Sequence, residues 1–268
     1  MGKVGEIRVG VGGWTFEAWR GGAFFPKGHP KTRELEYASR QLTTIEINGT
    51  FYSTQKPSSF RKWADETPDD FVFSVKAHRL TTNRRVLAEA GPSIDHFLNS
   101  GVTQLKSKLG PILWQFANHK KYDAADFEAF LKLLPRALDG LALRHALEVR
   151  HESFAIPEFV ALARKYGAAI VYAHHETYPE IADVTADFVY GRLQQSAAKV
   201  AAGYTAAAIK TWAKRARQWA EGKAPAGPPT LAKPAKLAKT DVFLYFIAGA
   251  KERNPAAAQA LLRELKRA

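Results

Sequence analysis

The chain has 268 residues, of which 46% are hydrophobic and 24% charged, and its formal net charge at pH 7 is +13. This composition is typical of a globular protein and excludes a disordered one, and the length suits one (β/α)8 barrel. The chain contains no cysteine, which excludes disulfides, thiolate metal sites and a cysteine nucleophile.

Membrane and export signals are missing from the sequence as well. No apolar run approaches the roughly 20 residues that cross a bilayer, so we expect no membrane partner. The first six residues lead directly into a strand-like run, without a long apolar stretch or a cleavage site. We therefore expect no signal peptide and a cytoplasmic location. No feature indicates an obligate protein partner.

Short β-branched or aromatic runs alternate with longer helical patterns along the whole chain. The predicted strands cover residues 7–13, 43–49, 71–77, 111–116, 146–151, 168–174, 188–193 and 242–247. The predicted helices cover residues 32–40, 58–66, 93–108, 125–138, 157–166, 204–221 and 255–266, and the last has Asn254 as its N-cap. The return after the sixth strand, residues 176–186, is expected to hold a turn or two at most.

Strands that alternate with helical returns predict a parallel sheet. Eight such units predict that residues 1–268 form a single (β/α)8 TIM barrel, with a doubly wound open sheet as the alternative. Residues 222–240 are rich in Pro and Ala and contain four lysines, which predicts a mobile basic loop. This loop precedes the eighth strand, so we expect it at the N-terminal end of the barrel.

Polar residues recur on one face of several predicted strands, close to their C-terminal ends. Alternate side chains of a barrel strand point into the lumen, and active sites of this fold lie at the C-terminal ends of the strands. The period of two therefore predicts a convergent polar site made of Glu46, Asn48, Lys76, Gln115, Glu148, Arg150 and Arg192.

Two interpretations of this set stay open. In the functional one, Glu46, Glu148 and Lys76 are the catalytic candidates of a hydrolase-type or lyase-type acid/base enzyme. Asn48, Gln115, Arg150 and Arg192 then bind substrate, and the surplus of cations over anions favours a phosphate or a carboxylate. In the structural interpretation, Glu46 pairs with Lys76, and Glu148 pairs with Arg150 or Arg192.

Features near the predicted mouth extend the functional interpretation. Residues 194–199 and the segment Gly249-Ala250-Lys251 precede helices whose free N–H groups attract anions, which makes Lys251 an anion-binding candidate. Trp14 and Tyr52 are candidates for stacking on a sugar or a base.

No cofactor is predicted from the sequence. His78, His151 and His174 follow three of the strands, but no HxH or HExxH spacing accompanies them. A divalent metal remains the weaker alternative.

Several motifs together resemble the YecE-like proteins, also called domain of unknown function 72. They are GGW at 12–14, EINGTFY at 46–52, FSVK at 73–76, LGPILWQ at 109–115 and EVRHESF at 148–154. The resemblance implies a TIM barrel and no established activity.

The C-terminal part departs from the pattern of that family. The family usually has a histidine where this chain has Gln194, and paired asparagines where it has Ile247-Ala248. A threonine-histidine pair is replaced by Thr82-Asn83.

The sequence leaves three functions open, and it does not decide whether the protein is an enzyme. The first is an enzyme that acts on a phosphorylated or otherwise anionic small molecule. The alternative is a nucleic-acid-binding or nucleic-acid-processing protein that uses its basic surface. The third is a ligand-binding module without catalysis.

Overall fold

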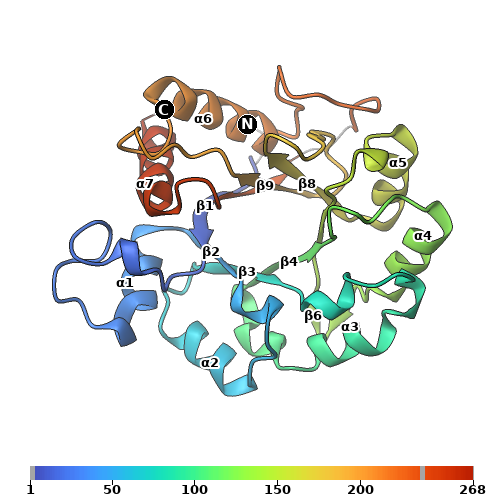
Figure 1. Ribbon diagram of the computed structural model, residues 1–268, viewed down its shortest axis with the longest axis horizontal. Coiled ribbons are helices and arrows are strands. Elements are labelled where there is room, and N and C mark those ends of the chain that lie inside the picture. Colours follow the sequence, from blue (N-terminus) through green and yellow to red (C-terminus); the bar gives the residue numbers. More distant parts are fainter. Residues whose placement is uncertain (1–3, 236–238, 268) are drawn as a thin grey trace.

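A computed structural model of the protein describes residues 4–235 and 239–267. Its main feature is a closed barrel of eight parallel strands (Figure 1). In the order in which they pair around the barrel, these are β1 (Ile7–Gly12), β2 (Thr44–Ile47), β3 (Val72–Lys76), β4 (Leu109–Gln115), β7 (His145–Glu148), β8 (Ala169–His174), β9 (Phe188–Leu193) and β10 (Asp241–Phe246). Because β10 pairs with β1 from Ile7 to Val11, the sheet closes. The predicted TIM barrel is confirmed, and the open sheet is excluded.

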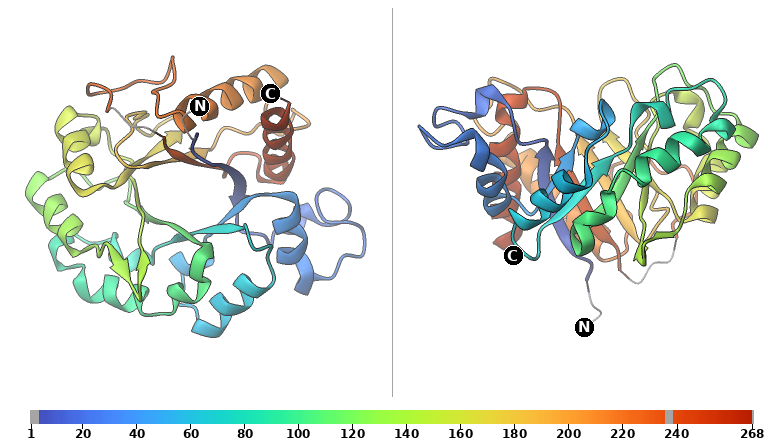
Figure 2. Two further views of the ribbon diagram at one scale, coloured as in Figure 1. Left: turned by 180° about the vertical axis from the view of Figure 1, so that it is seen from behind. Right: turned by 90° about the horizontal axis from the view of Figure 1, so that it is seen from below.

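Seven α-helices among the described residues surround the barrel (Figures 1 and 2). They are α1 (Glu34–Gln41), α2 (Pro57–Asp65), α3 (Gly91–Leu98), α4 (Ala124–Leu133), α5 (Pro157–Tyr166), α6 (Ala206–Ala220) and α7 (Asn254–Lys266). The connection from β8 to β9 is described in full and contains no helix, as the sequence predicted. None of the described helices has the length and hydropathy of a membrane span.

Two predicted helices are shorter than the sequence pattern indicated. The predicted helix 93–108 is interrupted at Gly101, whose φ of 109° is left-handed, and a separate 3-10 segment, η6 (Val102–Lys108), follows it. The predicted helix 125–138 ends at Leu133, because Pro135 forces the preceding residue out of the helical region. Its last two predicted residues form a small hairpin instead, β5 (Ala137–Leu138) with β6 (Leu141–Ala142).

The predicted N-cap of the last helix is wrong. Asn254 is already helical, with φ −58° and ψ −41°, so it is the first residue of α7. Its side chain bridges two loops instead of capping the helix. Asn254 Oδ1 accepts a hydrogen bond from Ser196 Oγ at 2.8 Å, and Asn254 Nδ2 donates to the carbonyl of Ala248 at 3.1 Å.

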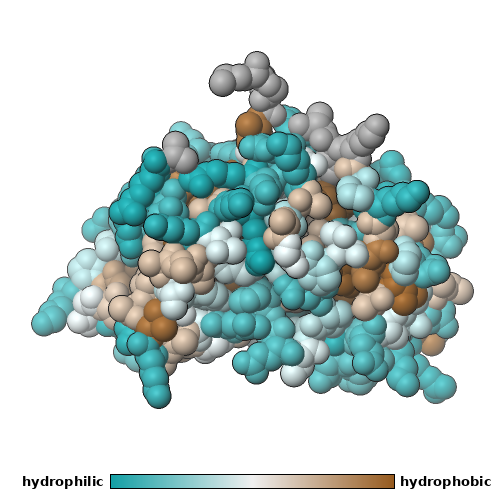
Figure 3. All heavy atoms as spheres, turned by 90° about the horizontal axis from the view of Figure 1, so that it is seen from above, coloured by the Kyte–Doolittle hydropathy of each residue, from teal (hydrophilic) through white to brown (hydrophobic). Residues whose placement is uncertain are grey.

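The barrel lumen is a packed core with a polar upper layer. Its apolar layer consists of Val72, Leu113, Ala146, Ala169, Val171, Ala186, Phe188, Tyr190, Phe243 and Tyr245. A larger apolar cluster fills the space between strands and helices. On the side of the molecule shown in Figure 3, hydrophilic residues predominate and are interrupted by smaller hydrophobic patches. Because the side chains of the apolar layer fill the described lumen, no open channel runs through it below the polar layer.

The Pro/Ala-rich loop leads from α6 into β10, at the N-terminal end of the barrel. Its backbone is held by the connection between β8 and β9. Ala182 donates to the carbonyl of Pro229, and the Asp183 carboxylate accepts from the amides of Leu231 and Ala232. Lys236 of this loop lies outside the described residues.

Candidate functional site

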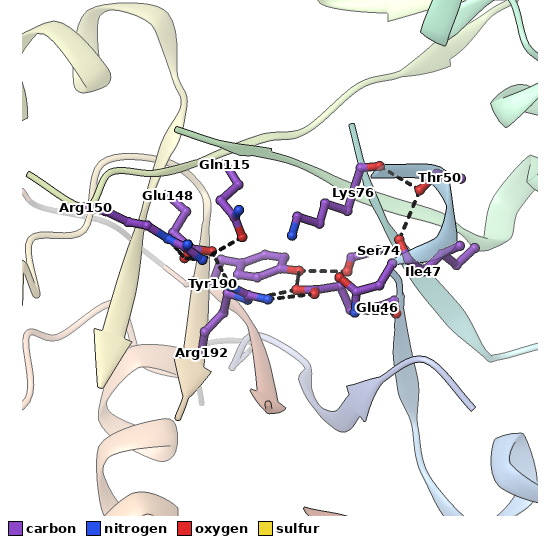
Figure 4. A network of polar contacts seen from close by, with 11 residues as sticks. Glu46, Ile47, Thr50, Ser74, Lys76, Gln115, Glu148, Arg150, Tyr190 and Arg192 are labelled. Atoms are coloured by element: carbon purple, nitrogen blue, oxygen red, sulfur yellow. Dashed lines mark hydrogen bonds and ion pairs between the residues drawn. The ribbon is translucent and has the colours of Figure 1, made fainter. Parts of the chain in front are cut away.

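Five polar side chains from five strands meet at the C-terminal end of the lumen (Figure 4). They are Glu46, Lys76, Gln115, Glu148 and Arg192, and none of them is more than 9% exposed. The alternation along each strand puts Glu46 two residues above Thr44, and Arg192 two residues above Tyr190. Five of the seven residues of the predicted convergent set thus lie together in this layer, whereas Arg150 contacts it through Glu148 and Asn48 lies in the lining of a neighbouring cavity.

Arg192 is the centre of this layer. Its Nε lies 3.1 Å from Glu46 Oε2 and its Nη2 lies 3.0 Å from Glu46 Oε1, while Nη1 donates to Glu148 Oε2. Burial opposes the charge on Arg192, but Glu148 and Glu46 raise the pKa of its guanidinium well above the ordinary value. One cation thus joins two carboxylates that enter from β2 and β7.

Tyr190 supports the Glu46 carboxylate from below. Its hydroxyl donates to Glu46 Oε2 at 2.6 Å and lies 2.8 Å from Ser74 Oγ. Burial, followed by the charge of Glu46, raises the pKa of Tyr190 far above its ordinary value, so the phenol stays neutral. The sequence assigned no role to Tyr190 or Ser74, although the period of two puts Tyr190 on the same face of its strand as Arg192.

Glu148 is held by a second arginine at the rim. Arg150 Nε lies 2.8 Å from Glu148 Oε1, and Arg150 Nη2 lies 2.7 Å from Gln115 Oε1. Burial acts to raise the pKa of Glu148, but Arg192, Arg150 and Lys76 offset it and lower the pKa below its ordinary value. Glu148 therefore stays ionised at neutral pH and is poorly suited to donate a proton.

Lys76 does not pair with Glu46, contrary to the structural interpretation. Within the described residues, its ammonium makes no hydrogen bond and no ion pair within 4.0 Å; it lies 3.9 Å from the centroid of the Phe51 ring. Burial is the largest influence, and together with Arg192 it lowers the pKa of Lys76 to about 8. The two arginines balance the two glutamates, so Lys76 is the surplus cation of the layer.

A cavity of about 380 Å³ opens at one side of this layer, between the ends of β1, β2 and β10. Arg192 and Asn48 line it, as do three further predicted binding residues, Trp14, Tyr52 and Lys251. We call this the mouth cavity. The other predicted site residues, namely Glu46, Lys76, Gln115, Glu148 and Arg150, are not in its lining. Arg192 therefore belongs both to the mouth cavity and to the buried charge layer.

The aromatic and basic residues of the mouth cavity differ in how they are held. Trp14 packs edge-on against Trp63, with ring centroids 5.3 Å apart, whereas Tyr52 is 69% exposed. Lys251 is exposed, and its Nζ lies 4.4 Å from the ring centroid of Phe16. Tyr52 and Lys251 are thus the residues most free to meet a ligand.

The anion contact predicted at the helix that follows Gly249-Ala250-Lys251 stays a prediction, but two amides of the segment itself are already hydrogen-bonded. The amide of Ala250 donates to the carbonyl of Ser196, and the amide of Lys251 donates to the carbonyl of Gly249. Gly249 is left-handed with φ 54°, and a Cβ there would lie 2.7 Å from Ser196 Oγ. The segment is a tight turn in which the amides of Ala250 and Lys251 are hydrogen-bonded to carbonyls. The anion-binding candidate in this segment is therefore the Lys251 side chain.

The four residues that depart from the family pattern lie in different places. Ile247 and Ala248 line the mouth cavity and give it an apolar wall where the family has amides. Gln194 is buried, and its Nε2 is enclosed without a hydrogen-bond partner in the part of the chain that the structure describes. Asn83 lies in a second depression, away from the mouth cavity.

That depression is a basic cleft of about 570 Å³, which sequence reasoning missed. It is lined by Asn83, Arg84, Arg85, His119, Lys120 and Lys121. These residues come from the loops that follow β3 and β4, so the cleft opens on the C-terminal side of the barrel. The signal was present in the two short basic runs that follow the predicted third and fourth strands.

The three histidines considered as metal ligands have other contacts. His78 and His151 accept hydrogen bonds from nearby backbone amides, of Leu80 and Ser153 respectively. His174 packs against Trp212, with ring centroids 5.0 Å apart. Within the described ranges, no three His, Asp or Glu side chains are grouped so that they could hold a metal ion.

A family model described as "Protein of unknown function DUF72" matches residues 8–268. The UPF0759 protein YunF of Bacillus subtilis is 27% identical over 161 residues, which are 57% of this chain and 54% of YunF. The UPF0759 protein YecE of Escherichia coli (strain K12) is 26% identical over 132 residues, 47% of this chain and 46% of YecE. The chain thus spans about half the length of these curated relatives.

Crystal structures of DUF72 family proteins have a similar fold. One from Enterococcus faecalis superposes with a TM-score of 0.72 at 16% identity, over 98% of this chain and 99% of that one. One from Thermotoga maritima gives a TM-score of 0.71 at 19% identity, over 98% of each chain. At these identities the similarity concerns the fold alone.

Proposed function

The chain belongs to the DUF72 family of proteins of unknown function, and from this premise we propose that it is an enzyme that acts on an anionic small molecule, a phosphate or a carboxylate. The substrate occupies the mouth cavity. The observation that carries the proposal is that Arg192 lines this cavity while it also ties together the buried carboxylates of Glu46 and Glu148.

The mouth cavity has the features of a small-molecule site. Its volume is in the range of such pockets, and it combines aromatic walls with a few polar groups. Lys251 supplies an exposed cation for the anionic group of the substrate, and Asn48 supplies an amide. Tyr52 covers the substrate from the rim.

Arg192 contributes to binding only in part, because three of its N–H groups are already directed to the two glutamates. Its role is to fix the carboxylates at the floor of the site. Lys76 is the group that exchanges a proton, since its pKa of about 8 is close to the working pH of a general acid or base.

A thermal-shift experiment tests this proposal. The protein is heated with inorganic phosphate, glucose 6-phosphate or malonate, and with glucose as the neutral control. Binding at 100 times Kd stabilises the native state by about 2.7 kcal/mol. The shift should disappear in Lys251→Ala and persist in Lys132→Ala, which removes an exposed lysine from the outer helix α4.

Two results would contradict the proposal. One is that none of the anions raises the Tm, and the other is a shift that Lys251→Ala leaves unchanged. Binding without turnover of any phosphate ester or carboxylate would favour the ligand-binding module instead.

The basic cleft favours a second candidate, a nucleic-acid-binding protein. Arg84 donates to the carbonyls of Leu80 and Glu89, and Lys120 forms an ion pair with Asp126 at 2.8 Å. Arg85 and Lys121 are exposed, and their side chains make no hydrogen bond or ion pair with described residues. These two cations are therefore available for phosphates.

Fluorescence anisotropy with a 20-nucleotide single strand and the matching duplex tests this candidate. Phosphate contacts release counterions, so affinity should fall steeply as salt rises. In Arg85→Ala/Lys121→Ala the logarithmic salt slope should be shallower by about 1 to 2. A slope that is flat in the unaltered protein counts against nucleic acid as the ligand.

A further inference from the structure

Two buried lysines of this protein have opposite environments. Lys108, in η6, is 9% exposed, and its ammonium donates to the carbonyls of Ala64 and Thr67 at 2.6 and 2.8 Å. Lys76 is 6% exposed, and in Figure 4 no dashed line reaches its ammonium. Only the Lys76 carbonyl is bonded there, by Thr50 Oγ1 at 2.6 Å. Lys108 is a structural lysine by these contacts, and Lys76 is not.

The surroundings of Lys76 favour its neutral amine. An ammonium loses hydration when it is buried, and neighbouring cations repel it. Burial and the charges of Arg192 and Arg150 act on Lys76 in this way. Since its pKa is about 8, about a tenth of Lys76 is neutral at pH 7, compared with less than one part in a thousand of an ordinary lysine.

The Lys76 amine is also open to a reactant. Its Nζ makes no hydrogen bond with the described residues, yet it is not among the fully enclosed polar atoms without a hydrogen-bond partner. The ammonium therefore reaches solvent at the C-terminal end of the lumen, beside the side chains that Figure 4 shows around it. Desolvation next to a cationic group is one way in which proteins activate an amine as a nucleophile.

We propose that the Lys76 amine attacks a carbonyl carbon of the anionic substrate and forms a protonated imine with it. This inference rests on the proposed function and narrows the substrate to an anionic aldehyde or ketone. The anionic group lies toward Lys251 in the mouth cavity, and the carbonyl group extends beyond the lining of this cavity, past Arg192, toward Lys76.

The step balances without an oxidant or a reductant. The ammonium first gives a proton to water at the mouth, and the nitrogen lone pair forms a bond to the carbonyl carbon. The carbonyl π electrons move to oxygen, which takes up a proton. One proton then moves from the nitrogen to this hydroxyl through water, and the hydroxyl leaves as water while the nitrogen lone pair forms the C=N bond. One ammonium and one carbonyl compound give one protonated imine and one water.

Glu46 and Glu148 suit this product, because their charges favour a cation at the Lys76 nitrogen. The iminium retains the charge of the ammonium that it replaces. The two arginines keep both carboxylates ionised and in place.

Reductive trapping tests the inference. The protein is incubated at pH 8 with dihydroxyacetone phosphate or pyruvate, sodium borohydride is added, and labelled peptides are identified by mass spectrometry. Dihydroxyacetone is the neutral control. Lys76 should be labelled at least about tenfold more than exposed Lys132, and Lys108 should stay unlabelled. Lys76→Arg keeps the charge and should remove the principal label, and circular dichroism checks that the variant is folded.

The outcomes separate this inference from the proposed function. Labelling spread evenly over exposed lysines would overturn the imine. If the same compounds raise the Tm through Lys251 but leave Lys76 unlabelled, the imine is wrong and the anion site stands. If they neither shift the Tm nor label Lys76, both proposals fail. Equal labelling by dihydroxyacetone would support the imine and overturn the requirement for an anionic group.

Discussion

Arg192 on β9 holds both carboxylate oxygens of Glu46 on β2, with N–O distances of 3.1 and 3.0 Å, although 146 positions separate the two residues in the chain. The strands that carry them lie on different sides of the barrel, with β10 and β1 between them. The contact therefore spans the lumen, and with the bond from Arg192 to Glu148 it ties together three strands.

Removal of Arg192 should strongly destabilise the protein. Arg192→Met leaves Glu46 with Tyr190 and Glu148 with Arg150, so that two buried carboxylates lose a shared counter-charge. Breaking a buried pair in this way costs about 3–5 kcal/mol, and urea unfolding measures it.

The control removes the carboxylate charges together with the arginine. Arg192→Met/Glu46→Gln/Glu148→Gln should recover about half of the loss, because no buried carboxylate is then left without its counter-charge, although Lys76 and Arg150 keep their charges. If Arg192→Met alone loses less than about 1 kcal/mol of unfolding free energy, Arg192 contributes little to stability.

Lys76→Met should stabilise the protein at pH 7, by about 1–2 kcal/mol, because it removes a buried cation that makes no hydrogen bond or ion pair with the described residues. The pKa of Lys76 falls from its ordinary 10.5 to about 8 on folding. Between pH 8 and 10.5 the unfolded chain thus binds more protons at this residue than the native state does, and native stability rises with pH. The gain in unfolding free energy from Lys76→Met, measured by urea unfolding, should therefore shrink as the pH rises from 8 to 10.5.

Lys108→Met is the matched comparison and should act in the opposite direction. It leaves the carbonyls of Ala64 and Thr67 without their buried donor, which costs about 1–3 kcal/mol. If the two variants change stability in the same direction, the contrast between the two lysines is wrong.

Glu148→Gln should fold but lose about 2–3 kcal/mol at neutral pH, since the amide replaces a carboxylate that receives hydrogen bonds from two arginines. The native pKa of Glu148 lies below its ordinary 4.5. Its stabilisation is complete above pH 4.5 and is lost as the pH falls through the native value.

The difference in unfolding free energy between the unaltered protein and Glu148→Gln should accordingly narrow below pH 4.5. A constant difference down to pH 3 would show that the charge of Glu148 is not what stabilises the layer.

Gly249→Ala should cost about 3 kcal/mol and weaken anion binding in the mouth cavity. Left-handed backbone costs a non-glycine residue about 1–2 kcal/mol, and the new methyl group collides with Ser196. Gly28→Ala has the same backbone cost at φ 73° but meets nothing within 4 Å, so it should lose only about 1 kcal/mol. Equal losses in the two variants would show that packing against Ser196 does not matter.

The sequence by itself determined the barrel and the set of residues that face its upper lumen. Strand side chains alternate with a period of two, so Glu46, Lys76, Glu148 and Arg192 were assigned to the lumen from their own strands alone. The order of strands and helices left few topologies to consider. Two predicted helices were too long, because the backbone conformations at Gly101 and before Pro135 are not helical although the hydrophobic period continues past them.

Only the tertiary structure decided which of these residues pair. A period shows that a side chain points inward, but its partner depends on how far distant strands are staggered when the barrel closes. Glu46 therefore met Arg192 and Tyr190 instead of Lys76, and Lys76 has no ion pair among the residues that the structure describes. Closure likewise brought the ends of β1, β2 and β10 together as the mouth cavity, and the loops after β3 and β4 as the basic cleft. Contacts between residues far apart in sequence are set by the geometry of the closed sheet, which no local pattern contains.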